Sequence, residues 1–202
     1  MGQRVKVARE KLIMGKSREE LEKEIIQFLD EGSTKMGDVN AKCALKHGIA
    51  CVLATSRNNI PRATPVDFFN EGLSIWIGAE PGGKLLNLKE NPNVSIGIYR
   101  PVDHSVVNKS IQYFGKASLI NMDNNSELYV SKMKKWGMYD TLSNMVRERI
   151  KQGIIQKGTE EEAIQKYLRA FNLIKVEPEK IIYLYIHPET GREKHIWEKK
   201  TE

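Results

Sequence analysis

The chain has 202 residues, of which 40% are hydrophobic and 29% charged, the balance of an ordinary globular protein built as one domain with embellishments. Its net charge is +6, but basic and acidic residues are interleaved and no dense Lys/Arg tract carries stacking aromatic side chains, so we expect no nucleic-acid partner. No apolar run approaches the roughly 20 residues that span a bilayer, so we expect no membrane partner.

The residue types that bind metals or react as nucleophiles are few and scattered. Cys43 and Cys51 fit no metal-binding spacing, and the basic N-terminus is not followed by an apolar stretch, so a reducing, cytoplasmic location is the simplest interpretation. His187 and His195 flank a predicted turn and either converge or, as we favour, lie in solvent. We therefore predict no metal site among the four histidines, which are His47, His104, His187 and His195.

Residues 1–48 are predicted to form an N-terminal helical segment that plugs or flanks the rest of the fold. Ser17 and Glu20 have the spacing of a capping box, which marks a helix start. Apolar residues follow at helical spacing until a glycine ends the helix, at Leu21, Ile25, Phe28 and Leu29. Asp38 is a candidate cap for a second short helix that ends at Gly48.

Residues 49–119 read as the core of a small β-barrel. Apolar and polar residues alternate in short runs, and turn-forming residues separate them. Gly115 in the last run indicates a bulge or a close approach of the backbone to another group. Short strands joined by tight turns favour an antiparallel meander that closes on itself. The runs are 49–55, 62–69, 73–78, 94–99 and 110–117.

Residues 120–171 are predicted to be a helical insertion, and residues 172–202 the last barrel strand with a charged C-terminal tail. The insertion has three apolar stripes at helical spacing, and the third begins at a capping box of Thr159 and Glu162. Its Met, Trp and Tyr residues either line a substrate pocket or, as we favour, simply pack on the barrel. The last strand is expected over residues 178–187. The tail after it is a candidate for contact with a partner subunit.

Lys84 is the strongest single candidate for binding an anion. Two glycines precede it at the start of a predicted helix, where free amides and the positive end of the helix dipole favour phosphate. The alternative is a solvated surface lysine. The surrounding sequence also matches the P-loop of nucleotide triphosphatases up to the last position, but Leu85 stands where that motif needs Ser or Thr, so we reject a P-loop.

Four segments, taken as an ordered set, resemble the FMN-binding split β-barrel proteins that are related to pyridoxamine 5′-phosphate oxidase. The resemblance extends over residues 20–118 and returns near residues 176–181. It implies a mainly β fold with helices: a six-stranded antiparallel split β-barrel, a homodimer, and FMN held at the dimer interface. The segments are Leu53-Ala54-Thr55, Arg62-Ala63-Thr64-Pro65-Val66, Ile77-Gly78, and Lys84 to Pro92.

The resemblance also assigns roles around the flavin. Lys84 and Arg62 are the residues implied to bind the FMN phosphate, with Gly83 beside them. On sequence alone, a solvated arginine at the end of a hairpin explains Arg62 nearly as well. Pro65 inside a strand belongs at an edge or an opening. Gln112 lies on the strand whose polar side chains face the flavin, and Ser110 is the alternative. The residues implied to run beside the flavin ring and its ribityl chain are Ala63, Thr64, Pro65, Ile77 and Gly78.

The chain departs from the family's vitamin B6 oxidase at the C-terminal end. That enzyme uses a tryptophan on its last strand and arginines just after it. Here Leu184 stands where the tryptophan would fall, and Arg192 lies in a different setting, so the vitamin B6 substrate does not transfer to this chain. We therefore expect an FMN-dependent oxidoreductase that acts on an unidentified small-molecule substrate or electron donor, with no catalytic residue assigned. The alternatives are a non-catalytic flavin or heme-binding protein and a deazaflavin-dependent reductase.

Overall fold

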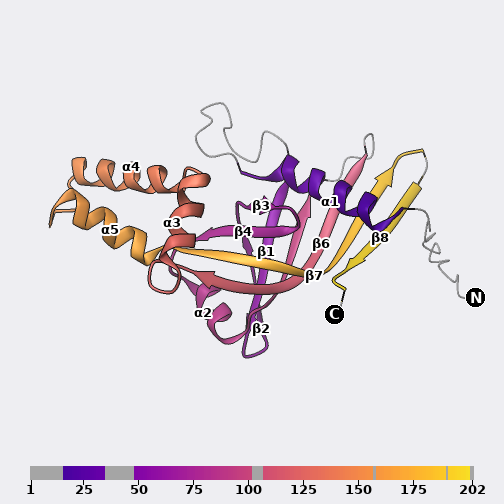
Figure 1. The fold of residues 1–202 in the computed structure, drawn as a ribbon, viewed down its shortest axis with the longest axis horizontal. Helices are drawn as coiled ribbons and strands as arrows, with labels where there is room; N and C mark the ends of the chain where they lie inside the picture. Colours follow the sequence, from indigo (N-terminus) through magenta and orange to yellow (C-terminus); the bar gives the residue numbers. More distant parts are fainter. Residues whose placement is uncertain (1–15, 35–47, 102–106, 157, 190, 201–202) are drawn as a thin grey trace, which may run out of the picture.

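The structure is a computed structural model that describes residues 16–34, 48–101, 107–156, 158–189 and 191–200. In chain order its strands are β1 (Ala50–Arg57), β2 (Ile60–Pro65), β3 (Phe69–Glu71), β4 (Ser74–Ala79), β5 (Asn93–Tyr99), β6 (Asn108–Ile120), β7 (Asn172–His187) and β8 (Gly191–Glu198). Its helices are α1 (Arg18–Gly32), α2 (Gly83–Glu90), α3 (Ser126–Lys135), α4 (Met138–Lys151) and α5 (Glu160–Ala170). Figure 1 shows helices flanking a strongly curved sheet.

The strands form one antiparallel sheet in the order β2-β1-β5-β6-β7-β4-β3, and β8 pairs with β7. The predicted antiparallel β fold with flanking helices is confirmed, but the described residues form a sheet of eight strands and not six. One extra strand arises because the predicted run 62–69 breaks after Pro65 and resumes at Phe69 as β3. The other is β8, whose mostly charged sequence hides the alternation that buries His195 and Trp197.

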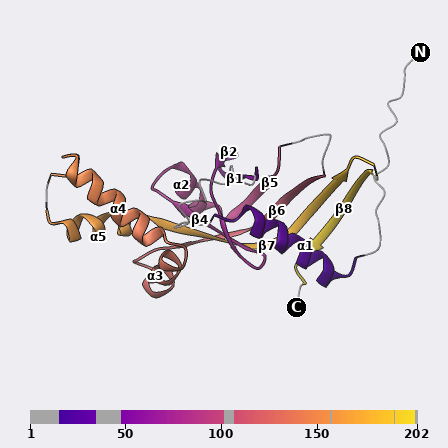
Figure 2. The ribbon, with the colours of Figure 1, turned by 90° about the horizontal axis from the view of Figure 1, so that it is seen from above.

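The inner face of the sheet and α1 enclose the larger of two hydrophobic cores, which we call the barrel core. The predicted capping box of Ser17 and Glu20 starts α1. Four apolar residues of the helix are buried in the same core as residues of β1, β5, β6 and β7: Leu21, Ile25, Phe28 and Leu29. Figures 1 and 2 both place α1 along the sheet. Gly32 ends the helix where a Cβ atom would lie 2.7 Å from Cγ2 of Ile49, so a larger residue would push the helix off the sheet.

A second core joins α3, α4 and α5 to the other face of β4, and we call these three helices the helical lobe. Figure 2 shows α4 and α5 extending away from the sheet. Trp136 stacks on Phe69 with ring centroids 4.8 Å apart and lies 5.4 Å from Trp76. Met133 is also fully buried there. These Met and Trp residues of the insertion therefore pack on the sheet, which is the interpretation we favoured.

Strand β7 connects the two cores and contacts β6 along nearly its whole length. The register between them shifts at Phe114 and Gly115, which confirms the predicted bulge. A Cβ atom on Gly115 would lie 2.1 Å from the backbone oxygen of Glu177, so only glycine lets the two backbones approach.

Some predictions fall outside the described residues: the second short helix between positions 38 and 48, and Cys43, His47 and His104. Within the described ranges, no helix combines the length and the apolar character needed to cross a membrane.

Candidate functional site

The site begins at the β1–β2 hairpin, which places Arg62. Asn58 and Asn59 both have positive φ, 51° and 61°, the backbone of a two-residue turn that matches the twist of the flanking strands. This confirms the predicted turn and sets the register in which Arg62 lies opposite Thr55. Because neighbours across an antiparallel pair share a face, Arg62 is on the side of β1 that packs against α2.

Helix α2 is locked against the same strand by a buried polar pair. The side-chain amide of Asn87 donates to the hydroxyl of Thr55 at 3.0 Å, and both residues are buried. A buried amide and a buried hydroxyl that satisfy each other fix one helix against one strand. The start of α2 is therefore held close to the hairpin that carries Arg62.

The first turn of α2 has no side-chain cap. The Gly82 carbonyl accepts the amides of Leu85 and Leu86 at 3.1 and 3.2 Å, which leaves the amides of Gly83 and Lys84 without a partner inside the helix. Such free N–H groups, together with the positive end of the helix dipole, favour an anion.

Arg62 lies directly over this helix start. A Cβ atom on Gly83 would lie 2.7 Å from Cζ of Arg62, 2.8 Å from Nη2 and 2.9 Å from Nε, so the guanidinium lies flat against the glycine backbone. Arg62 is exposed and Lys84 half-buried, and neither pairs with a carboxylate of the described residues. The structure thus brings Arg62, Gly83 and Lys84 together as two cations beside free amides.

This contact also joins the two ends of the sheet. Strand β2 is at one end of the strand order, and β4, which leads into α2, is next to the other end. Strand β3 pairs with β4 only as far as Trp76, so on that side Ile77 and Gly78 have no strand neighbour among the described residues. The sheet is open between β2 and β4, and the open edge of Ile77 and Gly78 lies just before the helix start.

The side chain of Ile77 does not reach this opening, and Gly78 has no side chain. Ile77 is fully buried in the barrel core. A Cβ atom on Gly78 would lie 2.8 Å from Cζ of Phe171 and 3.2 Å from the sulfur of Met138, so the helical lobe covers its other face. Only the backbone of this segment is available to a ligand. The sequence around Gly78 does not predict this contact, because Phe171 comes after the whole helical insertion and is far from Gly78 in the chain.

The other predicted residues divide between the two faces of the sheet. Ala63 and Pro65 of β2 and Gln112 of β6 are exposed and lie on the outer face, away from α1. Thr64 lies opposite Leu53 and faces inward. Ser110 is on the same face as Gln112, two residues nearer the start of β6, so both remain candidates.

The outer face around these residues is a shelf of small side chains. Following the register from Ala63 leads to Ala54 and Ser95, and following it from Pro65 leads to Val52 and Gly97. A Cβ atom on Gly97 would meet nothing within 4 Å, so the space above it is open. We assigned no role to Ala54, Ser95 or Gly97 from the sequence, although the alternation in their strands already places them on one face.

The two histidines of the described residues, His187 and His195, occupy different positions of one hairpin. On the β7–β8 hairpin His195 pairs with Tyr183, whereas His187 pairs with Gly191 at the turn. His195 is buried, with Nε2 3.2 Å from Oε2 of Glu193, so our expectation that it lies in solvent was wrong. Among the described residues no three His, Cys, Asp or Glu side chains gather in a way that would hold a metal ion.

Cys51 is not a nucleophile in this fold. Its thiol is buried in the barrel core, and this burial, together with the charge of Asp67, raises its pKa to about 12. The thiol is therefore protonated near neutral pH, and only a thiolate reacts readily.

The fold of this chain is similar to that of solved structures. Solved structures with a similar arrangement include PhzG from Burkholderia lata 383, with 12% identity, a TM-score of 0.50 and coverage of 76% of this chain and 77% of the other. They also include a pyridoxamine 5′-phosphate oxidase-related, FMN binding protein from Nostoc punctiforme, with 15% identity, a TM-score of 0.48 and coverage of 89% and 96%. At these identities the likeness concerns the fold alone.

The search of curated proteins found no match. A family model, in contrast, matches most of the chain: residues 39–185 fit the model described as pyridoxamine 5′-phosphate oxidase. The matched range contains β1 to α5 and most of β7, including the hairpin with Arg62 and the start of α2. The chain therefore belongs to the pyridoxamine 5′-phosphate oxidase family.

Proposed function

We propose that the protein is an FMN-dependent oxidoreductase of the pyridoxamine 5′-phosphate oxidase-like type, with its flavin at a homodimer interface and a small-molecule substrate or electron donor. The observation that carries the proposal is the contact between the Arg62 guanidinium and Gly83 at the uncapped start of α2, with Lys84 next in the chain. A terminal phosphate needs this combination of donors and positive charge.

The surroundings fit the rest of an FMN molecule. The shelf of Ala54, Ala63, Ser95 and Gly97 offers a flat ring a close approach to the backbone, and Gln112 on the same face supplies an exposed polar side chain. The open edge of Ile77 and Gly78 offers backbone groups near the phosphate end. FMN, when bound, would carry hydride or electrons; the chain would bind the cofactor, orient it and shield it.

A second copy of the chain would complete the site. The outer face carries three partly exposed large apolar residues, at 42%, 37% and 46% of their surface: Tyr99, Phe114 and Ile196. Burying apolar surface is favourable by ~25 cal/mol per Å², and a self-complementary patch is the usual basis of a symmetric dimer. The flavin ring on this face would then be enclosed between two subunits. Light scattering of a monomer that still holds one flavin per chain would contradict this part of the proposal.

The deciding experiment is the absorption spectrum of freshly purified protein, with mass analysis of the released chromophore. We expect the spectrum of an oxidised flavin and the mass of FMN. The mass of heme or of a deazaflavin would replace the proposal by one of the alternatives named above. Bound FMN that no nicotinamide or small-molecule donor reduces would identify a non-catalytic flavin protein.

A further inference from the structure

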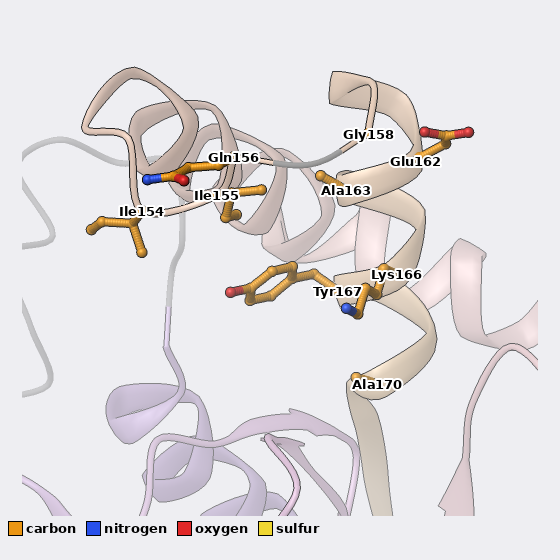
Figure 3. A pocket seen from close by; sticks show the side chains of 9 residues that line it. All are labelled: Ile154, Ile155, Gln156, Gly158, Glu162, Ala163, Lys166, Tyr167 and Ala170. Carbon is orange, nitrogen blue, oxygen red and sulfur yellow. The ribbon is translucent and has the colours of Figure 1, made fainter.

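The helical lobe contains a groove that the proposed flavin site does not use. It has a volume of about 580 Å³, which is in the usual range for small-molecule sites. The groove lies between α5 and the loop after α4, as Figure 3 shows. Its lining residues are Ile154, Ile155, Gln156, Gly158, Glu162, Ala163, Lys166, Tyr167 and Ala170.

One wall of the groove is an aromatic ring held in a fixed position. The Tyr167 ring projects from α5 into the space below Ile154 and Ile155 (Figure 3). Arg149 of α4 donates from Nη1 to the Tyr167 hydroxyl at 2.9 Å, and its Cζ lies 5.5 Å from the ring centroid. An aromatic ring anchored at its tip offers a flat, preorganised surface for stacking another ring.

The opposite wall is apolar and exposed. Ile154 has 67% of its surface exposed, so its side chain is available to a ligand. It follows Gly153, whose φ of +71° turns the chain at the end of α4 and presents Ile154 and Ile155 to the groove. A flat apolar ligand between Tyr167 and Ile155 would cover both walls.

The lining of the groove carries one cation, Lys166, and one carboxylate, Glu162. Lys166 makes no ion pair with any described residue, and the Arg149 guanidinium lies beside the Tyr167 ring. The acidic lining residue, Glu162, is engaged elsewhere: its Oε2 accepts the Thr159 amide at 2.8 Å in the capping box, and its side chain points away from the ring (Figure 3). The free cation therefore favours an anionic ligand.

We propose that this groove binds a planar aromatic molecule that carries one negative charge. The ring lies against Tyr167 and below Ile155, and the charge faces the ammonium of Lys166. The groove ends at Ala170, and the next residue, Phe171, packs against Gly78 of β4. The proposal does not rest on the flavin assignment, because none of the groove residues belongs to the predicted cofactor site.

The test is a calorimetric titration of the full-length protein with 2-naphthoate, and with 2-naphthalenemethanol as a neutral molecule with the same ring. We expect saturable binding of both, with the acid binding more tightly. Lys166→Met keeps the aliphatic stem and should weaken 2-naphthoate binding about threefold to fivefold, the range for a partly exposed charge pair, while leaving the alcohol unchanged. Tyr167→Leu and Ala170→Trp, which remove the ring wall and fill the end of the groove, should weaken both.

Lys134→Met is the matched control. Lys134 is also an exposed lysine of the helical lobe, 5.7 Å from the ring centroid of Tyr139, but it lies outside the groove. It should change neither titration. The proposal is wrong if no saturable binding occurs, or if Ala170→Trp leaves 2-naphthoate binding intact. It is equally wrong if Lys84→Ala weakens that binding as much as Lys166→Met, since the ligand would then occupy the helix start at α2.

Discussion

The barrel core and the helical lobe use the two faces of β4 in different ways. Ile75 and Ile77 point into the barrel core, which is assembled from residues far apart in the chain, from α1 to β8. Trp76 points the other way and is buried in the core of the lobe, most of which comes from the insertion between β6 and β7. One core is therefore defined by long-range strand pairing, and the other by neighbouring helices that dock through a few aromatic rings. The first is the framework of the candidate anion site, and the second is an attachment with a groove of its own.

The largest effect we predict breaks the barrel core. Gly115→Ala should lower the free energy of unfolding by more than about 3 kcal/mol, because the added Cβ atom would lie 2.1 Å from a backbone oxygen that cannot move aside without disturbing the β6–β7 pairing. Urea denaturation measures the loss. Gly97→Ala is the control, since it adds the same atom to the neighbouring strand β5 where nothing lies within 4 Å. Equal destabilisation by both substitutions would show that the bulge is not the cause.

The second prediction tests whether the two cores unfold independently. Trp136→Ala should cost about 3 kcal/mol, because it removes the ring that stacks on Phe69 and lies tilted against Trp76. The loss should be confined to the helical lobe. Amide hydrogen exchange should therefore speed up in α3, α4 and α5 while the amides of β1, β5 and β6 keep their protection. Faster exchange throughout the chain would mean that the two cores unfold as one unit.

The third prediction concerns the anion site on the barrel side. Lys84→Ala should weaken FMN binding by ~1.5–3 kcal/mol, the range for a hydrogen bond to a charged group, or roughly tenfold to a hundredfold in affinity. Riboflavin binding should hardly change, because riboflavin has no phosphate. Lys84→Arg should recover part of the loss, since a planar fork does not replace a point charge well. Flavin fluorescence titrations measure all three.

A substitution in the helical lobe provides the comparison for Lys84→Ala. Ala170→Trp fills the groove and should leave FMN affinity as it is. An equal loss of FMN and riboflavin affinity in Lys84→Ala would assign Lys84 a general role in supporting the loop, and the phosphate role would pass to Arg62. Loss of FMN in Ala170→Trp would place the cofactor partly in the lobe.

The smallest effect is a pH dependence at the junction of barrel and lobe. Burial acts to raise the pKa of Glu71, but hydrogen bonds from Lys132, at 2.6 Å, and from Lys135 outweigh it and hold that pKa below its usual range. A carboxyl with a depressed folded pKa stabilises the fold above its unfolded pKa, and this contribution is lost as the pH falls through the folded pKa. Glu71→Gln should therefore cost less than about 1 kcal/mol at pH 7 and nothing in acid. Urea midpoints of both proteins from pH 7 to pH 3 measure the difference, and a gap that persists in acid would rule out the ion pairs as its source.

What could be predicted from the sequence is local or repeated within a strand. The capping boxes at Ser17 and Thr159, the turn at Asn58 and the bulge at Gly115 each depend on residues close together in the chain. Strand β8 was not predicted, because its exposed positions carry charges that are typical of a solvated tail. Only the pairing with β7 shows which of its positions are buried.

The candidate site was predictable only in part. Lys84 stands out by itself, but its pairing with Arg62 came from a family resemblance. The contact between the Arg62 guanidinium and Gly83 follows from the curvature of the whole sheet, which joins the two ends of the strand order. Phe171 likewise covers Gly78 only because the insertion packs against β4. Such contacts join residues that are far apart in the chain, so no short segment of the sequence predicts them.

Strand β7 has a consequence for how such chains diversify. Its residues 172–176 lie between β4 and β6, its residues 180–187 lie between β6 and β8, and Pro178, which has no amide hydrogen to donate, stands at the change of partner. The strand is continuous, yet each half has its own neighbours. Descendants of one ancestral chain can therefore gain, lose or exchange the helices before residue 172, or the hairpin after residue 180, without altering the pairing of the other half.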